Sequence, residues 1–224
     1  MVIIGKICKY AFALLCLLGI SGFSNALAGS FKNQEMSSIF ELGIGAGVFF
    51  VLWMFYLSKR ENFWSVVEHE LTHALFALIF LKKVRTLSAN RSKGGLVQVE
   101  GGNWIIALAP YFFPLLSVFI ILMKPIILSS HQWLLNLLLG FSLMFHYVYL
   151  FGEFHPGQPD LRKSGIVFAI VIIIFFNIFF IGLSISSLSG QWSELWNYIN
   201  HGINKTATIT ISVLNYLQKS LVSL

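Results

Sequence analysis

The chain has 224 residues, of which 57% are hydrophobic and only 11% are charged. This composition excludes a soluble globular domain and indicates an integral membrane protein. The net charge of +6 does not indicate nucleic-acid binding, because most basic residues flank apolar segments, where they would meet lipid headgroups. These flanking residues are Lys59-Arg60, Lys82-Lys83-Arg85, Lys124 and Arg162-Lys163.

Six apolar segments are long enough, or nearly so, to cross a bilayer, since a helical span needs about 20 residues. In chain order they are residues 7–28, 38–58, 62–81, 104–123, 126–151 and 163–187. We therefore expect an all-α bundle of about five or six transmembrane helices, surrounded by the lipid bilayer of a bacterial-type inner or plasma membrane. Lys and Arg divide almost equally between the two sides, so charge does not predict the orientation.

The first 28 residues have the pattern of a secretory signal peptide. Lys6 and Lys9 precede an apolar core, and residues 26–28 form a small-x-small cleavage site. A retained first transmembrane helix is the alternative. Both cysteines, Cys8 and Cys16, lie in this segment, so a cleaved chain would contain none, and we expect no disulfide partner.

The third apolar segment contains His69-Glu70-Leu71-Thr72-His73 in a run without Gly or Pro, which predicts an α-helix. Residues four apart lie on one helical face, so His69 and His73 can bind one zinc ion. Glu70 would lie beside that ion and take a proton from the water it activates. The alternative is two surface histidines beside a solvated glutamate, but charged residues inside an apolar span are costly and usually functional.

Residues 94–102 predict a short, membrane-associated segment resembling a β-hairpin. Its sequence is Gly94-Gly95-Leu96-Val97-Gln98-Val99-Glu100-Gly101-Gly102. If Leu96 to Glu100 forms a strand with a free edge, Val97 and Val99 would present an extended substrate through main-chain hydrogen bonds. An ordinary loop hairpin is the alternative.

Asp160 is the only aspartate in the chain and is our candidate for the third metal ligand, because a catalytic zinc ion usually takes three protein ligands. It lies in residues 151–161, where two prolines and two glycines interrupt the flanking apolar runs. Irregular backbone near membrane depth is tolerated around a polar site. Glu153 and His155 are reserve ligands. The alternative is that Pro159 and Asp160 only begin the last apolar helix.

Residues 188–224 form a C-terminal tail that follows the domain of residues 29–187. Its apolar residues recur at steps of mostly three and four, which predicts an amphipathic helix that lies on the membrane or covers the bundle. These residues are Ile203, Ala207, Ile211, Leu214, Leu217 and Leu221. The alternation of Thr with Ala or Ile over residues 206–211 favours a strand as the alternative.

Three ordered elements between about Glu61 and Gly165 resemble the site-2 protease family of intramembrane zinc metallopeptidases. They are residues 69–74, residues 94–102 with the Pro-containing helix start at 109–114, and residues 153–160. The last is similar to the family signature Asn-x-x-Pro-x4-Asp-Gly, and the resemblance implies an aspartate ligand at Asp160. Glu153 stands where the family has Asn, the interval from Pro to Asp is one residue short, and Leu161 replaces the Gly. The chain would therefore be a minimal or divergent member.

We therefore expect an intramembrane zinc metalloendopeptidase that hydrolyses peptide bonds of membrane-associated proteins by metal-activated water. A metal-binding membrane transporter is one alternative, but the repeated halves with matching broken helices expected of that class are not found. A catalytically silent membrane scaffold is the other, and the presence of Glu70 argues against it.

Overall fold

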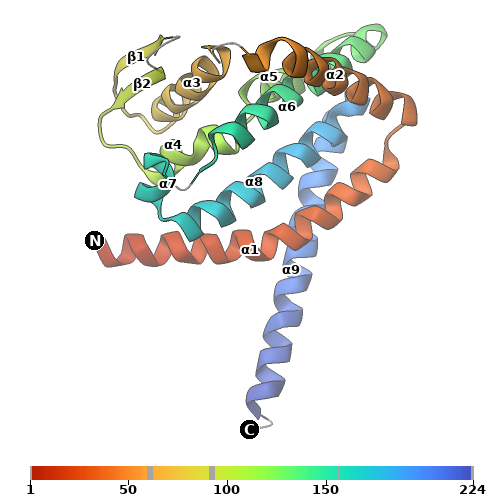
Figure 1. Ribbon diagram of the computed structural model, residues 1–224. Helices are drawn as coiled ribbons and strands as arrows, with labels where there is room; N and C mark the ends of the chain where they lie inside the picture. Colours follow the sequence, from red (N-terminus) through yellow and green to blue (C-terminus); the bar gives the residue numbers. More distant parts are fainter. Residues whose placement is uncertain (1, 60–62, 91–93, 156, 223–224) are drawn as a thin grey trace.

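The computed structural model describes residues 2–59, 63–90, 94–155 and 157–222. Within these ranges the chain is mostly helical and has one two-stranded sheet (Figure 1). The long helices are α1 (Val2–Asn33), α2 (Met36–Phe55), α3 (Phe63–Ile79), α6 (Gln132–Glu153), α8 (Ile166–Ser186) and α9 (Trp192–Val222). The short helices are α4 (Trp104–Leu108), α5 (Leu115–Met123) and α7 (Pro159–Ser164). The short 3₁₀ turns are η1 (Leu57–Lys59), η2 (Ala109–Tyr111), η3 (Lys124–Ile126), η4 (Ser129–His131) and η5 (Ser187–Ser189). The predicted all-α bundle with a small hairpin is confirmed.

Four helical stretches of the described chain are long and apolar enough to cross a membrane, which identifies a membrane protein. They are Lys6–Asn33, Met36–Lys59, Ser129–Glu153 and Ile166–Ser189. The pair Trp104–Tyr111 and Leu115–Ile126 adds a fifth if it counts as one span, although its halves are bent by 81°. Pro110 and Pro114 lie at this break, and neither has the N–H group that continues a helix.

The predicted span 62–81 is not among them, because the helix that the structure describes there is too short. α3 has 17 residues, fewer than the roughly 20 that a span needs. It ends where Leu81 adopts a left-handed backbone with φ of 54° and the Lys82 N–H donates to the Ala77 carbonyl over 2.8 Å. The turn directs the chain into a sheet that packs against α3 itself.

That sheet consists of β1 (Val84–Asn90) and β2 (Gly94–Val99), which pair in antiparallel fashion. Val84 lies opposite Val99 and Asn90 opposite Gly94, with an irregularity between Val84 and Thr86. The strand predicted at Leu96 to Glu100 is confirmed as far as Val99. Its partner β1 was not predicted from the sequence.

Lys124 departs from the prediction that it meets lipid headgroups. Its side chain is fully buried, and its ammonium donates to the Asn136 side-chain oxygen over 2.5 Å. The Asn136 amide in turn donates to Glu41 over 2.8 Å. This chain of hydrogen bonds joins α2, η3 and α6 and accounts for the buried charge. Arg60, another of the predicted headgroup residues, lies outside the described residues.

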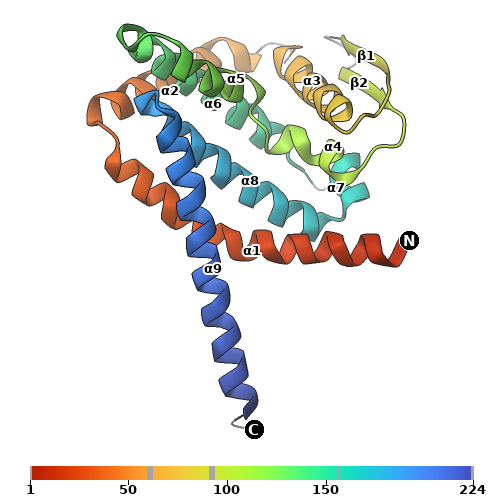
Figure 2. The ribbon, with the colours of Figure 1, turned by 180° about the vertical axis from the view of Figure 1, so that it is seen from behind.

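Helix α1 runs without interruption through the predicted cleavage site and packs against α8 and α9 (Figures 1 and 2). Cys16, Phe23 and Ala26 are buried in these contacts. Closer to the N-terminus, the Lys9 ammonium donates to the Ser164 carbonyl at the end of α7 over 2.6 Å. Cleavage after residue 28 stays a prediction, and it would remove all of these contacts.

The C-terminal tail is helical from Trp192 to Val222, so the predicted helix is confirmed and the strand alternative for residues 206–211 is wrong. Both views show α9 crossing α1 and then extending away from the rest of the chain (Figures 1 and 2). Ile211, Leu214 and Leu217 are exposed in this extension. Only the first part of α9 therefore covers the bundle.

Helices α1 and α9 lie in close contact at Gly22. A Cβ atom at this position would lie 2.7 Å from the backbone nitrogen of Thr206 and 2.9 Å from the carbonyl oxygen of Gly202. Real Cβ atoms do not come this close to backbone atoms, so the crossing depends on the missing side chain.

We expect Gly22→Leu to destabilise the protein by about 1–3 kcal/mol, because the added side chain must push two helical backbones apart. Gly29→Leu is the matched control, since nothing lies within 4 Å of a Cβ at Gly29 in the same helix. Both variants gain the same helix propensity, so the difference between their stabilities reports the packing at Gly22. Thermal unfolding in detergent measures it, and equal midpoints for the two variants would contradict the close crossing.

Candidate metal centre

His69 and His73 lie side by side on one face of α3. Their ring centroids are 4.8 Å apart, and their Nε2 atoms are 3.2 Å apart. The side chains are mostly buried, with 17% and 12% of their surface exposed. The two imidazoles are therefore neighbours, as the four-residue spacing predicts.

Asp160 reaches the same point from α7. Its Oδ2 atom lies 3.6 Å from Nε2 of His73. Helix α7 begins at Pro159, whose fixed φ suits the first helical position, and it packs against α4. The next residue, Leu161, is buried in the same hydrophobic cluster as Leu108 and Ala109, which anchors the first turn of α7. The structure thus brings together the three predicted ligands.

Both imidazoles donate a hydrogen bond on the side away from this meeting point. His73 Nδ1 lies 2.8 Å from the Ile106 carbonyl oxygen, and His69 Nδ1 lies 3.0 Å from Glu153 Oε2. A carbonyl and a carboxylate only accept, so each Nδ1 carries a proton. The two Nε2 atoms therefore face each other beside the Asp160 carboxylate, where each can offer a lone pair to a metal ion once it carries no proton. Three acceptor atoms at one point repel one another unless a proton or a metal ion lies between them.

Two of the three separations between these atoms match those around a zinc ion. His69, His73 and Asp160 each offer one ligand atom, and these atoms all lie within 4.8 Å of one another. Ligand atoms that bind one tetrahedral zinc ion at about 2.0–2.1 Å are about 3.3 Å apart. The observed 3.2 Å and 3.6 Å bracket that value. Two imidazoles and a carboxylate also form a donor set that suits zinc and leaves a fourth position for water.

The ionisation state of Asp160 also suits a metal ion at this point. Burial acts to raise the pKa of its carboxyl group, but the hydrogen bond and charge of His73 outweigh burial and hold the pKa below its ordinary value. The carboxylate is therefore ionised at neutral pH, which is the form that binds a metal ion.

The three ligands and Glu70 line one cleft of about 640 Å³, a size typical of binding sites. Strand β2 borders the cleft on one side, and α4 and α7 border it on another. Its other lining residues are Gly95, Leu96, Val97, Val99, Gly102, Asn103, Trp104, Ile106, Ala107, Gln158, Pro159, Lys163 and Ser164.

Glu70 and strand β2 are in direct contact at Gly95. A Cβ atom at residue 95 would overlap the Glu70 side chain, so the strand backbone lies directly beside the carboxyl group. The available signal for this contact was the pair of glycines that begins the strand, since a glycine in a strand often marks a close approach of another group.

The free edge of β2 borders the cleft. Glu100 donates its N–H to the Lys83 carbonyl over 3.0 Å, on the β1 side. Because N–H directions alternate along a strand, those of Val97 and Val99 point away from β1. Both valines line the cleft, so the two residues predicted to present a substrate border the same cleft as the three candidate ligands.

The two reserve ligands do not join the centre. His155 is exposed, and its Nδ1 accepts a hydrogen bond from the Gly157 N–H over 3.2 Å. Glu153 contacts His69 only through Nδ1, behind the ring, and does not belong to the group of three ligand atoms. Pro156, from the same predicted motif, lies outside the described residues.

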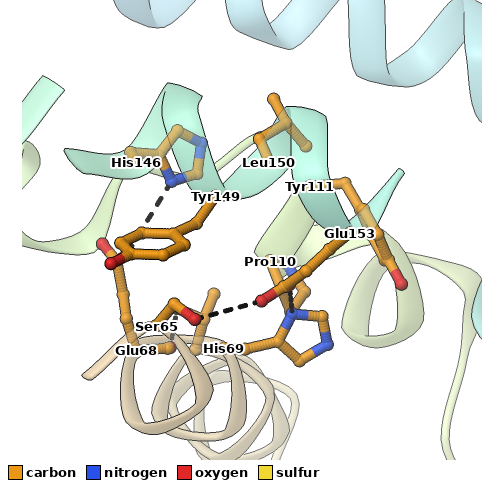
Figure 3. A pocket seen from close by; sticks show the side chains of 10 residues that line it. Ser65, Glu68, His69, Pro110, Tyr111, His146, Tyr149, Leu150 and Glu153 are labelled. Carbon is orange, nitrogen blue, oxygen red and sulfur yellow. Dashed lines mark hydrogen bonds and ion pairs between the residues drawn. The ribbon is translucent and has the colours of Figure 1, made fainter. Parts of the chain in front are cut away.

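A small polar pocket between α3 and α6 lies behind His69 (Figure 3). Ser65 donates its hydroxyl to Glu153 Oε1 over 3.3 Å, and His146 Nδ1 lies 4.0 Å from Glu68 Oε2. Sequence reasoning did not assign Ser65 or Glu68. The available signal was Glu68 itself, a second acidic residue inside an apolar helix beside the motif.

Comparison of the chain with family models, curated proteins and solved structures found no match. The assignment of the metal centre therefore rests on the geometry and chemistry of its own residues.

We expect the purified protein to bind about one zinc ion per chain, since the ligand atoms surround a single point. His69→Ala, His73→Ala and Asp160→Ala should each lower the zinc content, because two remaining ligands hold zinc poorly. His131→Ala, at an exposed histidine in η4, is the control that should keep it. Elemental analysis after dialysis measures the content. Zinc retained in Asp160→Ala at the level of the control would remove Asp160 from the ligand set.

Proposed function

We propose that this protein is a multi-pass intramembrane zinc endopeptidase that hydrolyses peptide bonds of membrane-associated proteins in a bacterial-type inner or plasma membrane. The observation that carries the proposal is the convergence of His69, His73 and Asp160 in one cleft with Glu70. The resemblance of the three sequence motifs to the site-2 protease family supports the same function.

The chemistry follows from the residue types in the cleft. His69, His73 and Asp160 would hold a zinc ion, which supplies a Lewis acid that polarises a carbonyl and makes water a stronger acid. Glu70 takes a proton from the attacking water as its oxygen bonds to the peptide carbonyl carbon. Glu70 then gives that proton to the nitrogen as the C–N bond breaks, so the products are a carboxylic acid and an amine.

The cleft also suits an extended peptide better than a helix. A helical substrate engages its carbonyl groups in its own hydrogen bonds and must unwind before hydrolysis. The free N–H groups of Val97 and Val99 can pair with an unwound segment and hold it extended. Because Gly95 lies against Glu70 in the same strand, a segment paired there runs past the catalytic base.

We expect Glu70→Gln to lower the cleavage rate by about 10²–10⁴-fold while zinc stays bound. The amide has nearly the shape of the carboxylate but cannot accept the proton. Cleavage of a membrane-anchored test substrate in proteoliposomes and zinc content are measured on the same sample. Glu35→Gln, at an exposed glutamate, is the control for loss of a charge. Near-normal turnover in Glu70→Gln would contradict the peptidase mechanism, and zinc transport without cleavage by the wild type would favour the transporter.

We expect Val97→Pro to reduce cleavage while leaving the zinc content unchanged, because proline has no N–H to offer at the free edge of β2. Val97→Ala is the matched control, since it shortens the side chain but keeps the N–H. The two variants are compared in the same cleavage assay. If they cleave equally, the substrate is not held by main-chain hydrogen bonds at this position.

A further inference from the structure

Glu153, the last residue of α6, is held against His69 from behind. Its Oε2 atom accepts the His69 Nδ1–H over 3.0 Å, and its Oε1 atom accepts the Ser65 hydroxyl over 3.3 Å. Figure 3 shows the carboxylate directed from α6 toward the His69 ring. Both oxygens are therefore engaged with groups of α3.

This arrangement differs from that of a metal ligand. The ligand atom of His69 is Nε2, which faces His73, whereas Glu153 lies at Nδ1. The imidazole ring thus separates the Glu153 carboxylate from the point at which the three ligand atoms converge. Any effect of Glu153 on the metal ion is transmitted through this ring.

We propose that Glu153 is a positioning residue of the metal centre, which orients His69 and strengthens it as a ligand. The hydrogen bond fixes the tautomer that leaves Nε2 free, and it restricts rotation of the ring. A carboxylate behind a metal-bound imidazole also raises the basicity of the ligand nitrogen. This role rests on the proposed zinc site, and it does not depend on peptidase activity.

The two histidines differ in this respect. His73 donates to the neutral Ile106 carbonyl, whereas His69 donates to a charged carboxylate, and a charge-assisted hydrogen bond is roughly twice as strong. His69 is therefore the more strongly polarised ligand of the pair. Removal of the Glu153 charge should weaken the contribution of His69 to zinc affinity and leave the contribution of His73 unchanged.

The test is the affinity of the full-length protein for zinc, measured by competition with a chromogenic chelator. We expect Glu153→Ala to weaken binding about 10–100-fold, the usual effect of losing such a partner. Glu153→Gln keeps an acceptor oxygen without the charge, so its loss of zinc affinity should be smaller. When Co²⁺ is bound in place of zinc, the absorption bands of this variant should be shifted from those of the wild type. Glu35→Ala is the control that should match the wild type. Unchanged affinity in Glu153→Ala would overturn the proposal.

A double variant separates positioning from direct ligation. If Glu153 acts through His69, the combination of His69→Ala with Glu153→Ala should bind zinc as weakly as His69→Ala alone. A further loss in the double variant, equal to the loss in Glu153→Ala, would overturn the positioning role and make Glu153 an independent ligand. Absence of zinc binding by the wild type would instead refute the metal centre itself. If the wild type and the variants show the expected zinc affinities but the wild type does not cleave the test substrate, only the peptidase function is refuted.

Discussion

The hydrogen bonds behind the two imidazoles are the constraint on which the centre depends. Because the Ile106 carbonyl and the Glu153 carboxylate can only accept, they direct the ring protons of His73 and His69 away from the cleft. The Nε2 atoms of the two rings thereby face the cleft, where they are available as ligands. The helical pitch of α3 brings the rings together, but elements distant in sequence determine their protonation.

The contrast with the buried network around Lys124 shows why the centre is unusual. There, each buried donor meets an acceptor, from Lys124 to Asn136 and from Asn136 to Glu41. Such a network satisfies itself and has a structural role. At the candidate metal centre, two imidazole nitrogens and a carboxylate meet at one point, and a proton or a metal ion between them removes their repulsion.

The sequence alone was sufficient to predict features that depend only on residues close together in the chain. The apolar runs predicted the long helices, because a span must satisfy its own backbone hydrogen bonds. The four-residue spacing of His69 and His73 predicted their juxtaposition, because it depends only on helical pitch. Asp160 was found by its rarity and its interrupted surroundings rather than by geometry, since its approach to His73 depends on the packing of α7 against α4.

Features that depend on distant contacts were missed or misjudged. Strand β1 has a mixed sequence and is defined by its pairing with β2. Residues 104–123 are apolar throughout but bend sharply near Pro110 and Pro114. Glu153 was predicted as a reserve ligand, because its sequence position shows that it is near the site but not which nitrogen of His69 it reaches.

The presence of a single aspartate in the first turn of α7 has a spectroscopic consequence. A sample labelled with ¹³C only at the aspartate side-chain carboxyl would contain one labelled site in the whole protein, and that site is the Asp160 carboxylate at the centre. Its chemical shift would respond to titration of zinc without any resonance assignment. Of the three candidate ligands, Asp160 is therefore the one that is most directly observed in solution.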